Sequence, residues 1–175
     1  MPFDLLGWFS ALASASGAIG TFWANHQNKR AQRALQQSDV NKIYDDETIW
    51  RATRYYVQPD GANVDPAQEA EMRHAAVVPG NLFHAIDQYL SGHSPHATHV
   101  RHLLLLADSG MGKTSFVLNY YARNQQLPSR QRQRLAVVPL GIPDALEKIM
   151  GIQHKAETTL FLDAFDEDTK AIQDH

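Results

Sequence analysis

Apolar and polar residues alternate in blocks along this chain, and in its second half the blocks predict a succession of strands and helices. Short apolar runs over 103–106, 135–140 and 158–162 have the length and composition of buried strands. Helix-compatible segments follow the first run, over 113–124, and lie between the other two, over 142–150. Strand, helix, strand, helix, strand is the order of an α/β protein with a parallel sheet.

The first half of the chain gives weaker signals. Residues 31–37 are rich in helix formers, and the polar residues that follow predict a hinge over 38–48. Residues 55–57 have the composition of a short β segment, ended by turn-forming residues at 59–61. Residues 81–90 carry apolar side chains at helical spacing, so we expect a helix there with one face in the core.

The N-terminal segment from Leu5 to Trp23 contains no charged residue, which predicts a single membrane-spanning helix. Its nineteen residues, at about 1.5 Å of rise each, nearly cover a hydrocarbon core of about 30 Å. Trp8 and Trp23 lie near the two ends, where indole rings prefer the membrane interface. Cations follow only on the carboxyl side, so we expect a single-pass protein whose remaining chain faces the cytoplasm.

Two alternatives remain for this apolar segment. Serine, threonine and glycine residues dilute its hydrophobicity, which is also compatible with an interfacial or oligomerisation helix. A cleaved signal peptide is the second alternative, because Ala13-Ser14-Ala15 resembles a cleavage site. Asp4 argues against it, since signal peptides begin with a basic region.

Composition narrows the classes of function further. The 175 residues are 43% hydrophobic and 20% charged, as in ordinary globular proteins. The net charge of -3 gives no overall signature of nucleic-acid binding, and we interpret Arg130, Arg132 and Arg134 as a solvated turn. The chain contains no cysteine, which excludes disulfides, thiolate zinc sites and cysteine nucleophiles.

Four histidines recur at every third position, at His93, His96, His99 and His102. We do not predict a metal site there. Pro95 prevents a regular helix, and a strand would place histidines three residues apart on opposite faces. No carboxylate lies among them to complete a site.

The segment after the first apolar run carries the residue types that bind phosphate. It reads Ala107-Asp108-Ser109-Gly110-Met111-Gly112-Lys113-Thr114-Ser115. Gly110 and Gly112 can adopt backbone angles closed to other residues, so that successive N–H groups point at phosphate oxygens. Lys113 offers a positive charge to the β- and γ-phosphates, Thr114 a hydroxyl ligand to Mg²⁺, and Ser115 a contact near the α-phosphate. We therefore predict a P-loop nucleotide-binding protein.

A second motif follows about fifty residues later, where the predicted strand over 158–162 ends at Asp163. An acidic residue at the carboxyl end of a core strand beside the P-loop strand can hold the hydration shell of Mg²⁺, as in a Walker B motif. Asp166 and Glu167 are the candidate catalytic residues that orient or deprotonate the attacking water. Asp168 fits a helix-capping residue in a solvated loop equally well.

The sequence of this second motif is similar to the signature of NACHT-type NTPases. It reads Leu162-Asp163-Ala164-Phe165-Asp166-Glu167. The segment from Ala107 to Ser115 resembles their P-loop, with alanine in place of the first glycine. The resemblance covers roughly residues 50 to 170. The path from Leu140 to Thr158 is shorter than in many NACHT domains, which leaves the subfamily open.

NACHT proteins are signal-transduction ATPases of the STAND class. The resemblance implies a three-layer P-loop NTPase fold with a parallel sheet, here incomplete and preceded by the N-terminal hydrophobic helix. It also implies ATP and ADP as ligands with Mg²⁺, a closed ADP-bound state, and a homo-oligomer on activation by ATP. The segment over 55–59 would lie near the adenine.

Together these patterns predict an anchor helix and stalk over 1–37, a linker and helical region over 38–98, and a P-loop NTPase core over 99–175. The core would be truncated after Walker B, so we expect a fragment that binds nucleotide weakly and turns it over little. The expected function is an ATP-hydrolysing switch in signalling or defence. An AAA+ or other P-loop motor, and a nucleotide-binding membrane scaffold without turnover, are the alternatives.

Overall fold

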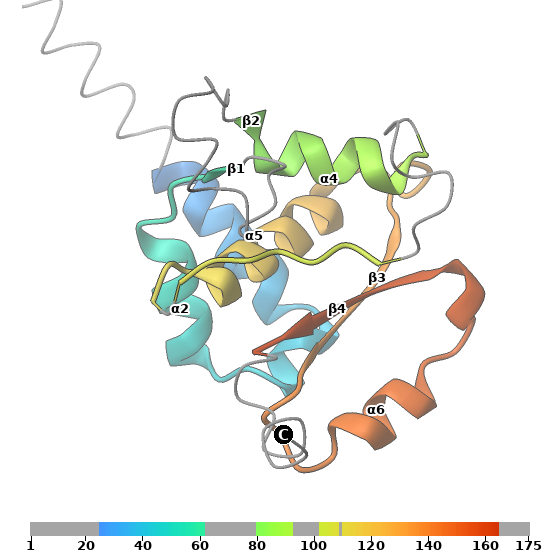
Figure 1. Ribbon diagram of the computed structural model, residues 1–175. Coiled ribbons are helices and arrows are strands. Elements are labelled where there is room, and N and C mark those ends of the chain that lie inside the picture. The colour runs from blue at the N-terminus through green and yellow to red at the C-terminus, as the bar shows by residue number, and fades with distance from the viewer. Residues whose placement is uncertain (1–24, 62–79, 93–101, 109, 165–175) are drawn as a thin grey trace, which may run out of the picture. The chain divides into compact units, whose positions relative to one another are not determined.

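The computed structural model describes residues 25–61, 80–92, 102–108 and 110–164. They form a mixed α/β structure with two small two-stranded sheets (Figure 1). The chain divides into two compact units. The first combines the residues up to Tyr56 with those from Gly112 onward, and the second is Val57–Met111.

The elements of the first unit follow in this order: a helix over residues 25–36, η1 (Asp39–Lys42), α2 (Asp46–Arg54), α5 (Lys113–Gln126), β3 (Arg134–Pro139), α6 (Ala145–Gly151), η3 (Lys155–Glu157) and β4 (Thr158–Asp163). The helices predicted over 31–37, 113–124 and 142–150 are confirmed, with ends shifted by a few residues. The strands predicted over 135–140 and 158–162 are confirmed as β3 and β4.

The core of the first unit is centred on α5. Its side chains are buried at every position from Phe116 to Ala122, so the helix is covered on more than one side. α5 packs against both α2 and β4 (Figure 1). On the β4 side, the ring centroids of Tyr120 and Phe161 lie 5.5 Å apart. The position of α5 therefore fixes the positions of α2 and β4.

A buried amide joins α5 to the end of α2. The Asn119 Nδ2 group donates hydrogen bonds to the carbonyl oxygens of Ala52 and Ser115, both at 2.8 Å. Ala52 lies in the last turn of α2, where carbonyl groups lack partners within the helix. Asn119 is only 6% exposed, so the side chain takes the place that water fills at an exposed helix end.

β3 and β4 pair in parallel, with Val138 opposite Leu162 and Pro139 opposite Asp163. α6 packs against β3. The prediction of a parallel pair is confirmed, but β4 is less buried than predicted, because most of its residues are half-buried and Leu162 is 47% exposed. Parallel strands are usually covered on both faces, and β4 has this cover only in part.

The second unit contains β1 (Asp60–Gly61), β2 (Gly80–Asn81) and α4 (Leu82–Leu90). β1 and β2 pair antiparallel. The Asn81 Oδ1 atom accepts a hydrogen bond from the backbone N–H of His84 at 2.9 Å and so caps α4. Phe83 and Ile86 are buried, which confirms the predicted helix with one face in the core.

The strand predicted over 103–106 is wrong. Residues 102–108 contain no strand, and three leucines of this run are largely exposed: Leu103 at 49%, Leu104 at 73% and Leu106 at 64%. An apolar run favours burial, but a strand also requires a neighbouring strand to which its backbone can hydrogen-bond. The parallel sheet of the described chain therefore holds β3 and β4, two of its three predicted strands.

The short β segment predicted over 55–57 is also wrong. Tyr55 ends α2 and is 75% exposed, and Val57 is 83% exposed. The guanidinium of Arg54 lies over the rings of both Trp50 and Tyr55, at 4.4 and 4.8 Å from their centroids. These cation–π contacts attach Tyr55 to the end of the helix.

Within the described ranges, no helix combines the length and the apolar character that crossing a membrane requires. The predicted span from Leu5 to Trp23 lies outside these ranges and stays a prediction. The predicted regions 1–37, 38–98 and 99–175 also stay predictions. The compact units follow contacts, so the first of them is discontinuous in sequence.

Replacing Asn119 by alanine should lower the free energy of unfolding by about 1–3 kcal/mol, because the Ala52 carbonyl loses its buried donor. Urea denaturation followed by circular dichroism measures this change. Asn41→Ala is the matched control, since Asn41 is exposed and should change stability by less than about 0.5 kcal/mol. Equal effects of the two substitutions would contradict a bridging role for Asn119.

Candidate phosphate and magnesium site

The start of α5 has the backbone geometry of an anion-binding helix end. Gly112 precedes the helix with a φ of 85°, in the left-handed region that glycine adopts readily. Its carbonyl accepts a hydrogen bond from the Phe116 N–H at 2.8 Å, which closes the first turn. Lys113, Thr114 and Ser115 form that turn and are half-buried. The N–H groups of a first turn have no partner within the helix and favour negative charge.

The remaining predicted phosphate-binding residues belong to the end of the second unit. The Met111 N–H donates to the Asp108 carbonyl at 3.3 Å, which closes a turn. Ala107, Asp108, Gly110 and Met111 are exposed. Gly110 has a φ of 78°, so this position too uses left-handed backbone. Ser109 lies outside the described residues.

Asp163, the predicted magnesium residue, is the last residue of β4 and is only 4% exposed. Its Oδ2 atom accepts a hydrogen bond from the Tyr44 hydroxyl at 2.9 Å. Its backbone carbonyl accepts from the Leu140 N–H, also at 2.9 Å. Ala164 follows with a φ of 57°, a left-handed conformation that costs a non-glycine residue about 1–2 kcal/mol. Such strain persists where the surrounding structure holds it.

Tyr44 is itself 8% exposed and belongs to the segment between η1 and α2. Burial raises the pKa of Tyr44 above its usual value, and the charge of Asp163 and the hydrogen bond to it raise the pKa further. The hydroxyl therefore keeps its proton and acts as the donor. A buried carboxylate needs such a partner, because an unpaired buried charge is strongly unfavourable.

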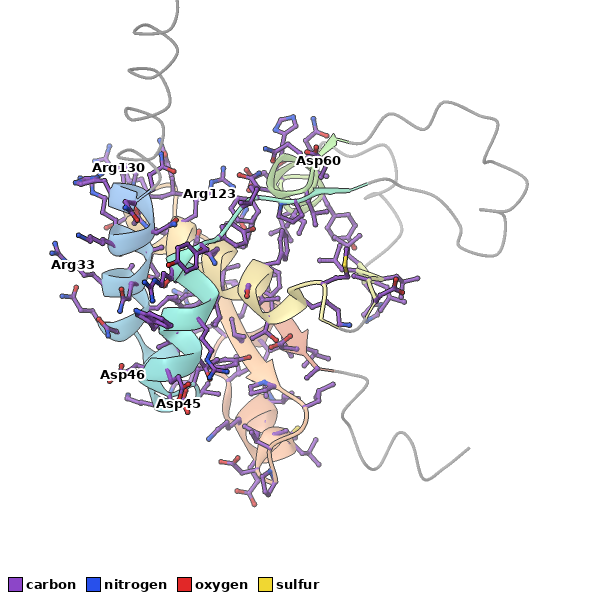
Figure 2. The ribbon with its side chains drawn as sticks, turned by 90° about the vertical axis from the view of Figure 1, so that its left-hand side faces the viewer. Arg33, Asp45, Asp46, Asp60, Arg123 and Arg130 are labelled. Atoms are coloured by element: carbon purple, nitrogen blue, oxygen red, sulfur yellow. The ribbon has the colours of Figure 1, made fainter. Side chains whose placement is uncertain are left out.

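The packing of α5 against β4 brings the two predicted motifs into one unit. The ring of Tyr120 stacks on that of Phe116, in the first turns of α5, and lies tilted against the ring of Phe161 in β4. Figures 1 and 2 both show the arrowhead of β4 on the same side of this unit as the start of α5. The structure thus places Asp163 and the α5 turn that carries Lys113 on one side of the same unit.

The side chains present at these ends are hard oxygen donors, which suit Mg²⁺. Thr114 contributes a hydroxyl and Asp163 a carboxylate. Among the described residues, no group of three or more histidine, aspartate or glutamate side chains is arranged to hold a metal ion by itself. Mg²⁺ usually takes only one or two protein ligands and completes its shell with water and phosphate oxygens, so this donor set fits it.

Several other predicted residues lie outside the described residues. The candidate catalytic residues Asp166 and Glu167 are among them, as are His93, His96 and His99. His102 is described and exposed. The catalytic roles of Asp166 and Glu167 stay predictions, as does the absence of a metal site at the histidines.

The basic cluster has a local structural role. Arg130 and Arg132 are exposed, as predicted for a solvated turn (Arg130 is labelled in Figure 2). The Arg132 Nε–H donates to the Leu127 carbonyl at 2.7 Å, and Arg134 lies 3.7 Å from the Glu157 carboxylate. The first contact lies in the turn between α5 and β3. Arg134 is the first residue of β3, so the prediction of a turn is wrong at this position.

Tyr44 is the residue that the sequence did not reveal. It lies in the predicted hinge and has no motif around it, and its partner Asp163 is 119 residues further along the chain. In the sequence, Tyr44 is an aromatic residue among mostly polar ones. This pattern indicates that its side chain is buried, but it does not indicate which residue it contacts.

We compared the chain with known proteins and found no relative. No protein-family model, no curated protein sequence and no solved structure matches this chain. The function is therefore inferred from the residues themselves.

Gly112→Ala should lower the free energy of unfolding by about 1–2 kcal/mol, because alanine must adopt the left-handed backbone. The cost is conformational, since the added Cβ would lie 3.9 Å from its nearest neighbour, the Ser115 Cβ, which is an ordinary contact. Gly151→Ala is the control. Its Cβ would meet no atom within 4 Å, and we expect stability to be unchanged or higher by up to about 1 kcal/mol in urea denaturation. A Gly112→Ala protein as stable as wild type would contradict the assigned backbone conformation.

Proposed function

We propose that this chain contains the ATP-binding core of a NACHT-like signal-transduction ATPase of the STAND class. One observation carries the proposal. Lys113, Thr114 and Ser115 begin a helix that packs against a parallel strand, and this strand ends at the buried Asp163. A P-loop NTPase needs these residue types at these two positions.

The proposal includes the finer fold, a three-layer P-loop NTPase with a parallel sheet. The pairing of β3 with β4 and the packing of α5 on β4 support it. From the sequence pattern alone, the proposal extends the phosphate loop to Ala107–Met111. The NACHT assignment rests on the resemblance of Leu162 to Glu167.

Each residue has a distinct role in this proposal. Backbone N–H groups at the start of α5 bind phosphate oxygens, and the Lys113 ammonium adds a positive charge. Asp163 orients water molecules of the Mg²⁺ shell, and Thr114 offers its hydroxyl. Mg²⁺, when bound, would neutralise the charge that develops on the transferred phosphoryl group. Asp166 and Glu167 would orient the attacking water and accept its proton.

The proposed switch is anchored to a membrane by the segment from Leu5 to Trp23, with the ATPase on the cytoplasmic side. The absence of charge in this segment and the cations after it support the anchorage. As the NACHT resemblance implies, the protein would be closed when ADP is bound, and exchange of ADP for ATP would favour a homo-oligomer.

Replacing Lys113 by alanine should weaken binding of ATP and ADP by about 10- to 150-fold, because each charge-assisted hydrogen bond to phosphate contributes about 1.5–3 kcal/mol. Isothermal titration calorimetry with ATP, ADP and GTP, each with and without Mg²⁺, measures the loss. Lys155→Ala is the matched control, since Lys155 is an exposed lysine of the same unit. Wild-type protein that binds none of the three nucleotides would contradict the proposed function, as would equal binding by the Lys113→Ala variant.

Replacing Glu167 by glutamine separates a hydrolase from a scaffold. In a hydrolase this change should abolish phosphate release and retain bound ATP, because the amide cannot accept a proton from water. Asp168→Asn is the neighbouring control and should hydrolyse ATP at nearly the wild-type rate. If Glu167→Gln leaves both the retention of ATP and the rate of phosphate release at their wild-type values, the scaffold alternative is favoured.

A further inference from the structure

The hydrogen bond between Tyr44 and Asp163 joins two distant parts of the chain at the proposed magnesium site. Both side chains are buried, and the two oxygen atoms lie 2.9 Å apart. Tyr44 comes from the short connection between η1 and α2, and Asp163 from the end of β4. The hydroxyl donates a hydrogen bond to the carboxylate, because an ionised carboxylate can only accept one.

This bond takes up one acceptor position of the Asp163 carboxylate. An ionised aspartate has two oxygens and about four acceptor positions, and Tyr44 occupies a position on Oδ2. The other oxygen can accept hydrogen bonds from the water shell of a metal ion. A donor that holds one oxygen also fixes the rotation of the carboxylate, and loss of such a partner typically lowers metal affinity about 10- to 100-fold.

The segment that carries Tyr44 is firmly attached to the core of the first unit. Val40 in η1 is 2% exposed, and its carbonyl accepts hydrogen bonds from the N–H groups of Ile43 at 3.0 Å and Tyr44 at 2.9 Å. Asp45, the next residue, caps α2. A displacement of the connection over 38–45 would therefore move the Tyr44 hydroxyl away from Asp163.

We propose that Tyr44 is a positioning residue that orients Asp163 for Mg²⁺-dependent nucleotide binding and couples the connection over 38–45 to the nucleotide site. This inference rests on the proposed function, because it takes Asp163 as the magnesium residue. Coupling between two sites is reciprocal. If the connection orients Asp163, the Mg²⁺–nucleotide complex must in turn stabilise the connection.

The decisive variant is Tyr44→Phe, which keeps the buried ring and removes the donor. We expect the Mg²⁺ concentration for half-maximal nucleotide binding to rise about 10- to 100-fold, as for loss of an outer partner of a metal ligand. ADP affinity without Mg²⁺ should stay at the wild-type value. In an Asp163→Asn background, Tyr44→Phe should produce no further change in the Mg²⁺ dependence.

Tyr89→Phe is the control. Tyr89 lies in α4 of the second unit, and the change likewise removes only a tyrosine hydroxyl. Its Mg²⁺ dependence should equal that of wild type. Equal shifts in both tyrosine variants, an unchanged Mg²⁺ dependence in Tyr44→Phe, or a lower Mg²⁺ requirement would each overturn the positioning role.

Hydrogen exchange on the wild-type protein tests the coupling even if Tyr44→Phe fails to fold. Mg²⁺–ADP should slow exchange of the Ile43 and Tyr44 amides several-fold, and ADP without Mg²⁺ should not. Unchanged exchange at these amides would overturn the inference. If nucleotide binding depends on Lys113 and Asp163 but neither test responds, the proposed function stands and only this inference fails. A wild-type protein without nucleotide binding overturns both.

Discussion

Burial of α5 is the interaction on which the rest of the first unit depends. Leu118 and Ala122 are fully buried. The ring of Tyr120, which lies between them in the sequence, contacts Phe116 of the same helix and Phe161 of β4. Each large apolar side chain buried in this way stabilises the fold by about 1.5–3 kcal/mol. Because α2 and β4 pack against this helix, its burial also determines where its own first turn and the end of β4 lie. The packing of the core thus positions the two chain segments that carry the candidate site.

The sequence predicted the elements whose signals are local. The apolar spacing and the ends of α4 and α5 are visible in the chain, and so are the apolar runs of β3 and β4. The predictions failed where an element needs a distant partner. Residues 103–106 have the composition of a strand, but composition cannot supply the neighbouring strand to which its backbone would bond. The partial exposure of β4 has the same origin, since cover on a sheet face comes from elsewhere in the chain.

The residues of the candidate site also differ in whether a local sequence pattern could predict them. Motif spacing predicted that Lys113, Thr114 and Asp163 belong to one site, and the structure places them in one unit. The roles of Asp166 and Glu167 stay predictions. Tyr44 was missed because its importance comes from a contact with a carboxylate in another part of the chain, and no pattern of neighbours encodes it. A buried aspartate needs a donor for its charge, but this requirement does not say which residue provides it.

The discontinuity of the first unit has a consequence for the order in which it forms. The helix over 25–36 and α2 leave the ribosome long before α5 and β4, because the second unit lies between them in the chain. Until α5 is synthesised, Ile49 of α2 lacks the helix against which α2 packs, and Tyr44 lacks its acceptor until Asp163 emerges. Contacts of such large sequence separation slow folding, since the intervening chain must be closed into a loop first. The early helices therefore expose apolar surface during synthesis, the period in which chaperones bind nascent chains.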